Sequence, residues 1–458
     1  MNTRTATLLA LTLAACGPGS SGDDAVDAPP SDGVLPPIFI PGGGVTSAPI
    51  DGVVNVYVID ADTDAPLAGA AVHLGGAADA LQLDATTDPD GLAVFKDAGL
   101  TGPVTLTATA GARTAATWIG VAGGNATMPL TLRATPTAHA SGTIAGWSSL
   151  PAPSFGHYTL AVVTTSFTHD VGNAANRIAQ GSSGGTPTNT CVDSGSGGAC
   201  AWQLNTRVGR QLHTAVIVDG DSHLTSGTDD DTYTLVGYAV GQPVTMTAGQ
   251  QLSGESLTIV PAAQHTGFTA HFPAAAPGLG RAVAIPMLDT GDAGMVPFPL
   301  PTLTATASST QVLAPGGALA GSYRLVGLAT PSATATAPYA SSFVAVPSLG
   351  NATLPAWLPP PTGVSGSGGT VAFTPPAGAA VTFAALGGGG TTAWVVTVLD
   401  GSTSFRLPTI SPDPLGGGGA TLDVSTAEVP GFTPGMFLVD DVTTAVTRVS
   451  GVTATFAR

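Results

Sequence analysis

The chain has 458 residues, of which 43% are hydrophobic and only 9% are charged. This apolar content excludes a chain that is disordered overall, and the length exceeds that of one typical domain. The 12 Lys and Arg residues against 29 Asp and Glu residues give a net charge of −17, which argues against a nucleic-acid partner because basic surface is scarce.

The amino-acid usage favours an all-β protein. Thr and Val favour strands, whereas 62 Gly and 38 Pro residues interrupt the sequence too often for long helices. After residue 15, no apolar run is long enough to span a bilayer. We therefore expect tandem immunoglobulin-like or transthyretin-like β-sandwiches, after a disordered N-terminal tether, outside the cytoplasm.

The N-terminal segment carries the clearest signal. Arg4 precedes a short apolar run that leads into Leu13-Ala14-Ala15-Cys16. This arrangement resembles the signal peptide and lipobox of bacterial lipoproteins. The resemblance implies that the signal peptide, residues 1–15, is removed and that Cys16 becomes the lipidated (palmitate-type) N-terminus. Gly17 stands where an Asp retains members of that family in the inner membrane, which implies an outer-membrane lipoprotein facing the periplasm or the cell surface.

Two alternatives compete with the lipobox interpretation. An ordinary secretory signal needs no cysteine after Leu-Ala-Ala, and a transmembrane anchor needs roughly 18–20 apolar residues, more than this stretch offers. The segment that follows, residues 16–51, is rich in Gly, Pro, Ser and Asp and is predicted to be a flexible tether. Its apolar stretch, 34–40, is able to dock onto the first domain.

Residues 52–134 show alternating strands and turn signals. Val54, Val56 and Val58 alternate with other residues in the first strand, and an Asp-rich turn follows. This range resembles the carboxypeptidase regulatory-like, or transthyretin-like, β-sandwich. The matching residues are Asp60, Thr63, Pro66, Leu67, Gly69, Ala70, Val72, Asp88, Gly91 and Phe95. The resemblance implies a rigid, non-catalytic module in which Val72 and Phe95 face the core.

A second sandwich is predicted over 137–262, with a long loop at 170–200. Cys191 and Cys200 remain after Cys16 is assigned to lipid, and their spacer, 192–199, is flexible enough to close a ring. An oxidising compartment favours a disulfide over two free thiols. A metal site is disfavoured because neither Cys-x-x-Cys nor a nearby His pair accompanies them.

Two further sandwiches are predicted. One covers 265–357, and the other, 358–458, begins at a Pro-rich boundary and resembles a fibronectin type III domain. In this resemblance, Trp394 points inward and fills the core.

The densest carboxylate cluster contains Asp219, Asp221, Asp229 and Asp231. Calcium needs six to eight oxygen ligands, and the two acidic runs on one loop offer some of them. The order of an EF-hand loop is not followed, so Asp residues in strand-end turns are the preferred explanation. We therefore predict no cofactor, with calcium as the alternative.

Other motifs give weaker signals. Ser183 lies in a Gly-x-Ser-x-Gly motif, but it lacks the strand and helix that a nucleophile elbow requires. His265 and His271 share strand parity without a zinc motif. The five tryptophans are spaced as core residues are, although a sugar-binding role needs them exposed.

The sequence as a whole favours a lipid-anchored envelope protein that acts as a non-catalytic structural, adhesive or ligand-presenting scaffold. The predicted partners are the membrane, through the lipid, and an envelope protein or polysaccharide. The first alternative is a carbohydrate- or calcium-binding accessory of a secreted degradative system. The second is a hydrolase, which requires a polar pocket with Ser or a carboxylate beside His.

Overall fold

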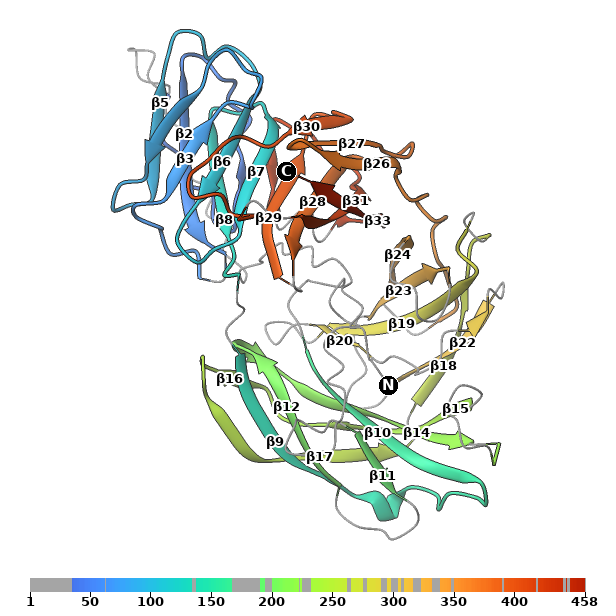
Figure 1. Ribbon diagram of the computed structural model, residues 1–458. Helices are drawn as coiled ribbons and strands as arrows, with labels where there is room; N and C mark the ends of the chain where they lie inside the picture. The colour runs from blue at the N-terminus through green and yellow to red at the C-terminus, as the bar shows by residue number, and fades with distance from the viewer. Residues whose placement is uncertain are drawn as a thin grey trace. The chain divides into compact units, whose positions relative to one another are not determined.

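Figure 1 shows a computed structural model of the chain. It describes residues 35–61, 63–133, 137–166, 190–193, 200–221, 223–224, 232–261, 265–274, 278–289, 295–297, 304–305, 309–315, 323–331, 338–346, 350–388, 391–416, 419–439, 442 and 445–457. These residues are mostly in strands and include a short 3-10 helix, Trp147–Ser149, which confirms the all-β prediction. Within these ranges, no helix is long and apolar enough to cross a membrane. The described residues divide into two compact units, one within 137–357 and the other combining 35–133 with 358–457.

The first sandwich belongs to the second of these units. One of its sheets has the order β32-β1-β8-β2-β5, and the strands β7-β6-β3-β4 form part of a larger sheet. The strands are β1 (Gly44–Val45), β2 (Val53–Asp60), β3 (Ala71–Leu74), β4 (Leu83–Thr86), β5 (Leu92–Lys96), β6 (Val104–Thr109), β7 (Ala115–Val121), β8 (Asn125–Leu130) and β32 (Phe437–Leu438).

The motif residues of this sandwich have the structural roles that the resemblance implied. Val72 and Phe95 are buried, at 1% and 3% exposure. Asp60 Oδ1 accepts hydrogen bonds from the backbone N–H and the hydroxyl of Thr63, which closes the turn after β2. Gly91 has φ of +75°, and a Cβ there would lie 2.8 Å from the carbonyl oxygen of Val58, so the hairpin requires glycine.

The folded part begins inside the range predicted as a tether. β1 pairs with both β8 and β32, and Val45 is buried. The backbone N–H of Ile38 donates to Asn125 Oδ1 at 3.0 Å, and that of Ile40 donates to Thr127 Oγ1 at 3.0 Å. Residues 35–51 are therefore part of the sandwich, because backbone donors of this segment find partners on β8 and Phe39 packs against Tyr57 of β2.

The last sandwich continues the larger sheet of the first. β29 pairs with β7 in parallel, from Trp394 opposite Ala115 to Val398 opposite Ile119. Trp394 is fully buried, as predicted, and its Nε1–H donates to Thr117 Oγ1 on β7 at 2.9 Å. Its strands are β26 (Thr362–Ser367), β27 (Thr370–Thr374), β28 (Val381–Gly388), β29 (Thr391–Val398), β30 (Ser404–Arg406), β31 (Ala420–Glu428) and β33 (Arg448–Ala457).

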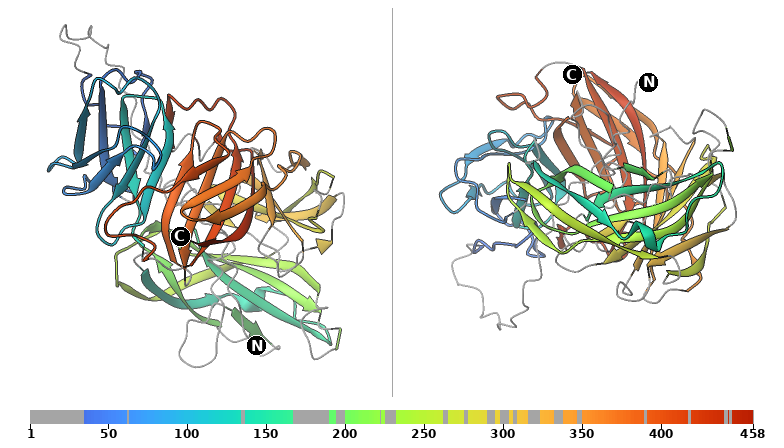
Figure 2. Two further views of the ribbon diagram at one scale, coloured as in Figure 1. Left: turned by 45° about the horizontal axis from the view of Figure 1, so that its top comes forward. Right: turned by 90° about the horizontal axis from the view of Figure 1, so that it is seen from below.

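The other unit contains a seven-stranded sheet of order β11-β10-β14-β15-β17-β9-β12 (Figures 1 and 2). Its strands are β9 (Thr137–Ala145), β10 (His157–Thr165), β11 (Thr190–Asp193), β12 (Cys200–Arg207), β14 (His213–Asp221), β15 (Thr232–Val240) and β17 (Gln251–Pro261). A two-stranded ribbon joins β13 (Gly209–Gln211) to β16 (Val244–Met246).

The remaining strands of this unit, from 265 onward, form a sheet of order β22-β18-β25 and the path β20-β19-β23-β24, with β21 paired to β19. They are β18 (His265–His271), β19 (Arg281–Asp289), β20 (Met295–Pro297), β21 (Thr304–Ala305), β22 (Ser309–Pro315), β23 (Tyr323–Thr330), β24 (Tyr339–Val346) and β25 (Ala352–Thr353).

Two apolar cores lie on opposite faces of the seven-stranded sheet. Val216 and Val218 of β14 belong to a core that also contains Leu325 and Trp357, so the predicted ranges 137–262 and 265–357 share one core. The alternate β14 residues, Ala215 and Ile217, belong to the other core. This second core also contains Ala140, Ile144, Ala161, Val163, Trp202, Leu204 and Leu257, all contributed by strands of the same sheet.

Candidate functional site

The polar side chains of interest occupy both ends of one strand pair. β10 and β14 run antiparallel, with His157 opposite Asp221 at one end and Thr165 opposite His213 at the other. Directly opposed residues share a face of a sheet, and these share the face of Ala215 and Ile217. A histidine–carboxylate cluster therefore lies at each end of this apolar face.

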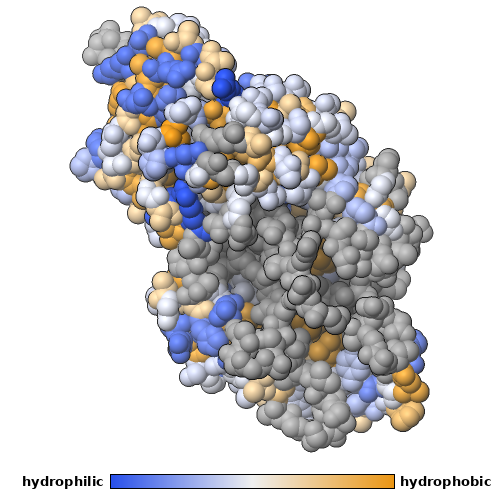
Figure 3. Space-filling view, viewed as in Figure 1, coloured by the Kyte–Doolittle hydropathy of each residue, from blue (hydrophilic) through white to orange (hydrophobic). Residues whose placement is uncertain are grey.

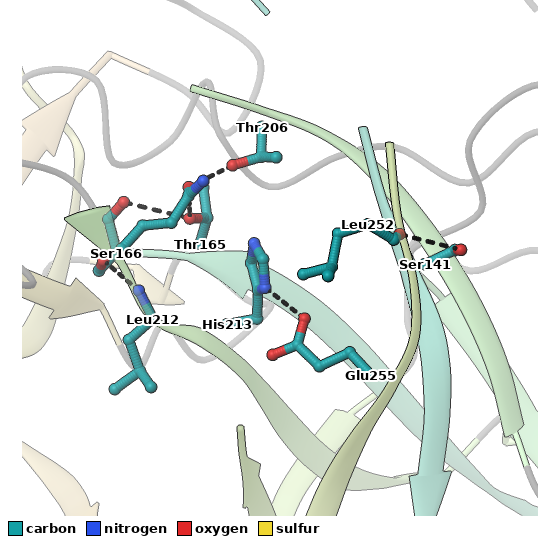
Figure 4. Close-up of polar contacts among 9 residues, drawn as sticks. Ser141, Thr165, Ser166, Thr206, Leu212, His213, Leu252 and Glu255 are labelled. Carbon is teal, nitrogen blue, oxygen red and sulfur yellow. Dashed lines mark hydrogen bonds and ion pairs between the residues drawn. The ribbon is translucent and has the colours of Figure 1, made fainter. Parts of the chain in front are cut away.

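The interior cluster is a buried pair, His213 and Glu255. His213 Nδ1 lies 2.6 Å from Glu255 Oε2, and the two side chains are 0% and 9% exposed. The ring of Trp202 packs against the imidazole with centroids 5.6 Å apart. Figure 4 shows the pair at the centre of a set of polar contacts contributed by several strands.

An irregularity in β17 places Glu255 beside His213. The parallel register of β17 with β9 shifts between Leu252 and Glu255, and Gly254 within the shift has φ of +78°. A bulge of this kind redirects the side chain that follows it. Gly241 gives the carboxylate room, since a Cβ on this residue would lie 2.4 Å from Glu255 Oε1.

The residues next to His213 form their own hydrogen bonds. Thr165 Oγ1 donates to Gln211 Oε1 at 2.6 Å, and Thr206 Oγ1 donates to the same oxygen. The backbone N–H of Leu212 donates to Ser166 Oγ at 2.8 Å. Among the described residues, His213 Nε2 and Glu255 Oε1 have no hydrogen-bond partner.

This arrangement fits a structural role better than acid–base catalysis. A base needs a reacting group within hydrogen-bond reach, and His213 has no exposed surface through which a substrate could approach. Its contact with Glu255 instead joins β14 to β17, strands that lie on either side of β15.

The cluster at the other end is partly exposed and contains two histidines. His157 Nδ1 lies 2.9 Å from Asp219 Oδ2, and His157 Nε2 lies 3.8 Å from Asp221 Oδ2. His223 Nε2 lies 3.9 Å from that same oxygen of Asp221. The backbone N–H of His223 donates to Asp221 Oδ1 at 2.9 Å. This hydrogen bond, with smaller electrostatic contributions from His223 and His157, holds the pKa of the Asp221 carboxyl below its usual range.

The structure places two of the four predicted calcium ligands in this cluster. Asp219 and Asp221 lie on one face of β14, whereas Asp229 and Asp231 lie outside the described residues. Across the described ranges, no group of three His, Cys, Asp or Glu side chains could hold a metal ion. Calcium binding at this loop therefore stays a prediction.

Sequence reasoning missed the histidine partners of these carboxylates. His157 is 62 residues from Asp219, and His213 is 42 residues from Glu255. Only the strand pairing brings them together. The one pattern that could have indicated them is alternation: His157 and Asp219 each lie an even number of residues from the apolar positions of their own strand, which places them on the same face as those residues.

The other sequence candidates have mixed outcomes. The backbone places Cys191 on β11 and the buried Cys200 on β12, and their disulfide stays a prediction. Cys16 and Ser183 lie outside the described residues, and His271 is exposed at the end of β18. All five tryptophans are buried, which confirms their prediction as core residues: Trp118, Trp147, Trp202, Trp357 and Trp394.

Comparison with known proteins gives structural neighbours at low similarity. No family model matches the chain, and no curated protein matches it. The Bacillus anthracis TIE protein is 9% identical with a TM-score of 0.17, over 67% of this chain and 49% of that protein, so the chain spans about half its length. The major pilin subunit BcpA of Bacillus cereus is 10% identical over 60% of this chain and 87% of that one, with a TM-score of 0.16.

The fimbrial protein FimP from Actonomyces oris is also 10% identical, over 69% of this chain and 99% of that one, with a TM-score of 0.17. These identities and TM-scores carry no functional argument. The proposals below rest on the residues of this chain.

Proposed function

We propose that the chain is a lipid-anchored envelope protein that acts as a non-catalytic structural or adhesive β-sandwich scaffold. The observation that carries the scaffold role is the continuous sheet through the first and last sandwiches. β7 and β29 pair over five residue positions across the seam, and buried Trp394 donates to Thr117 there. A joint of this kind makes the two sandwiches one rigid body rather than two linked domains.

A second contact over the same seam supports this role. Phe437 of β32 packs on Trp118 of β7 with ring centroids 5.5 Å apart, while β32 also pairs with β1. The start of the fold, at β1, is thereby attached to the C-terminal part of the chain.

The surface is consistent with an exposed protein that stays soluble. On the face shown in Figure 3, hydrophilic and hydrophobic residues are interspersed over the first and last sandwiches. The net charge of −17 opposes self-association. The accessory role in carbohydrate binding loses the support of the tryptophans, because sugar stacking requires exposed rings and all five tryptophans are buried.

The anchor and the location are tested together. The full chain and its Cys16→Ser variant would be expressed in a Gram-negative host with an alkyne-labelled palmitate. We expect label and detergent-phase partitioning for the wild type only, with protease treatment of intact cells reporting the side that the protein faces. Unlabelled wild-type protein released into the medium would contradict the lipid anchor.

A further inference from the structure

The outer face of the five-stranded sheet in the first sandwich presents apolar side chains to solvent. Directly paired residues share a face of a sheet, so one row of residues crosses all five strands. The row runs from Leu438 on β32 through Gly44, Thr127 and Tyr57 to Leu92 on β5. Leu438 is 43% exposed, and Tyr57 and Leu92 are partly exposed.

Residues 35–40 cross this face as a strap and cover its polar side chains. The backbone N–H groups of Ile38 and Ile40 donate to Asn125 Oδ1 and Thr127 Oγ1, both at 3.0 Å, and these two acceptor side chains are fully buried. The polar groups of the sheet thus bind the backbone of the strap, while the side chain of Ile38 remains 44% exposed. The strap therefore turns a polar strip of the sheet into an apolar surface.

The exposed apolar side chains of the strap and the sheet lie together, and we call them the outer patch. Phe39 packs edge-on against Tyr57, with ring centroids 5.4 Å apart. Toward the other end of the row, Ile40 packs over Gly44, where a Cβ would lie 3.3 Å from its Cγ2. Seven large hydrophobic side chains are exposed in the described part of the chain, and four of them form this patch: Ile38, Phe39, Val94 and Leu438. Single exposed hydrophobic residues are normal, whereas a gathering of them marks an interaction surface.

We propose, on the premise of the lipid anchor, that the outer patch rests against the lipid surface of the membrane to which the chain is attached. The described chain enters at this face, because the carbonyl of Leu35, the first described residue, accepts a hydrogen bond from Asn55 Nδ2 at 3.2 Å. Between Cys16 and Leu35 lie residues 17–34, which even when fully extended reach at most about 65 Å. The anchor therefore holds the patch within reach of the bilayer, and its point of attachment favours this face over the others.

The chemistry of the patch suits the headgroup region of a neutral membrane. Aromatic rings concentrate at membrane interfaces, and the only lysine of the chain, Lys96, is exposed on the same face of β5 as Val94. Burial, and the charges of Asp88 and Asp90, raise the pKa of the Tyr57 hydroxyl, so the patch also has an acidic margin. We therefore expect zwitterionic lipid to be preferred to anionic lipid. A second copy of the chain is a poorer occupant, because the net charge of −17 opposes self-association.

The test attaches the mature chain to vesicles without relying on lipidation in a cell. Residues 17–458 with an N-terminal hexahistidine tag are bound to phosphatidylcholine vesicles that contain a nickel-chelating lipid, and hydroxyl-radical footprinting reports the exposure of each side chain. The oxidation of Phe39 and Leu438 should fall roughly threefold or more on vesicles, because an apolar face inserts into the headgroup boundary. Phe155, which is 92% exposed in the other compact unit, is the matched control and should be oxidised equally in both states.

Substitutions on the patch separate it from the tag. The double variant Phe39→Ser with Leu438→Ser should abolish the protection of Ile38 and Val94, and Phe155→Ser should leave it unchanged. Melting temperatures report whether each variant is folded, and Val94→Asp, at an exposed position, replaces the double variant if that one does not fold.

Unchanged oxidation of Phe39 and Leu438 on vesicles would overturn the proposal. Protection of the patch in concentrated free protein would also overturn it, since the occupant would then be a second copy. Because the tag takes the place of the lipid, either result would leave the lipid anchor itself to the palmitate experiment.

Discussion

At the scale of single residues, His213 and Glu255 form a buried ionisable pair within the seven-stranded sheet. A buried ionisable pair is weak evidence for stability, because removing both partners in favour of apolar groups is often neutral or stabilising. Removing one partner leaves the other buried without compensation. We therefore expect the pair as a whole to add little to the net free energy of folding.

A double-mutant cycle tests this account. We expect His213→Leu to lower the free energy of unfolding by about 3–5 kcal/mol, because it leaves the carboxylate of Glu255 buried and unpaired. The double variant, His213→Leu with Glu255→Leu, should recover most of that loss. Urea unfolding followed by tryptophan fluorescence measures both, with His139→Gln at an exposed contact to Asn205 as the control. A double variant that is less stable than His213→Leu would contradict the interpretation.

Asp423 on β31 gives a pH-dependent prediction. Burial raises the pKa of this carboxyl, although a hydrogen bond from Thr453 Oγ1 opposes the shift. A raised folded pKa means that stability is greatest below the unfolded value of about 3.9 and declines as pH rises through the folded value. Asp423→Asn removes this decline, so it should raise the melting temperature at pH 7 and leave it unchanged near pH 3.5. A gain of equal size at both pH values would show that the carboxyl does not titrate as described.

At the scale of elements, the two edge strands of the seven-stranded sheet lie close to each other. β11 and β12 stand at opposite ends of the strand order, yet they are consecutive in the sequence and lie in contact. Unpaired edges invite association with other strands. A disulfide from Cys191 to Cys200 would join the two edges and close the sheet upon itself.

We expect this disulfide to be present and to stabilise the sheet. Thiol titration of the denatured, unreduced mature chain should detect no thiol from Cys191 or Cys200. Cys16 should react only in molecules that carry no lipid. Reduction, or the double variant Cys191→Ser with Cys200→Ser, should lower the free energy of unfolding by about 2.5–3 kcal/mol according to the loop-entropy relation for a ring of this size. Two additional reactive thiols in the unreduced protein would contradict the prediction.

The strands themselves were largely predictable because alternation and turn residues are local signals. The turn at Asp60 and the glycine at Gly91 could be assigned from the motif alone, and both have the expected geometry. The position of Glu255 could not, because it depends on a register shift in a parallel pairing with β9. The segment 35–40 lies in the range predicted as a tether because Gly and Pro surround it, and only its apolar residues indicate docking onto the first sandwich. The bonds from its backbone donors to Asn125 and Thr127 span 87 residues, so no local pattern predicts them.

At the scale of the whole molecule, the pairing of the first and last sandwiches decides the architecture. Local patterns predicted two separate domains at 52–134 and 358–458, and no local signal indicates that β7 adds to β29. Both edges are rich in β-branched and small residues, so they pair as readily across the chain as within one sandwich. The buried hydrogen bonds from Trp394 to Thr117, and between Thr117 and Thr107, then fix the joint.

This architecture predicts that the first sandwich depends on the last one. A fragment covering 35–134 loses the partner of β7 and exposes Trp118, which packs against Phe437 in the whole chain. We expect this fragment alone to give a poorly dispersed amide spectrum, and co-expression with 358–458 to recover a folded complex of the two. The fragment 135–357 is the matched control, because it belongs to the other compact unit. A dispersed amide spectrum for 35–134 alone, with the same melting temperature as in the complex with 358–458, would mean that the first sandwich folds without the shared sheet. In that case, the scaffold would consist of independent domains joined by their surfaces.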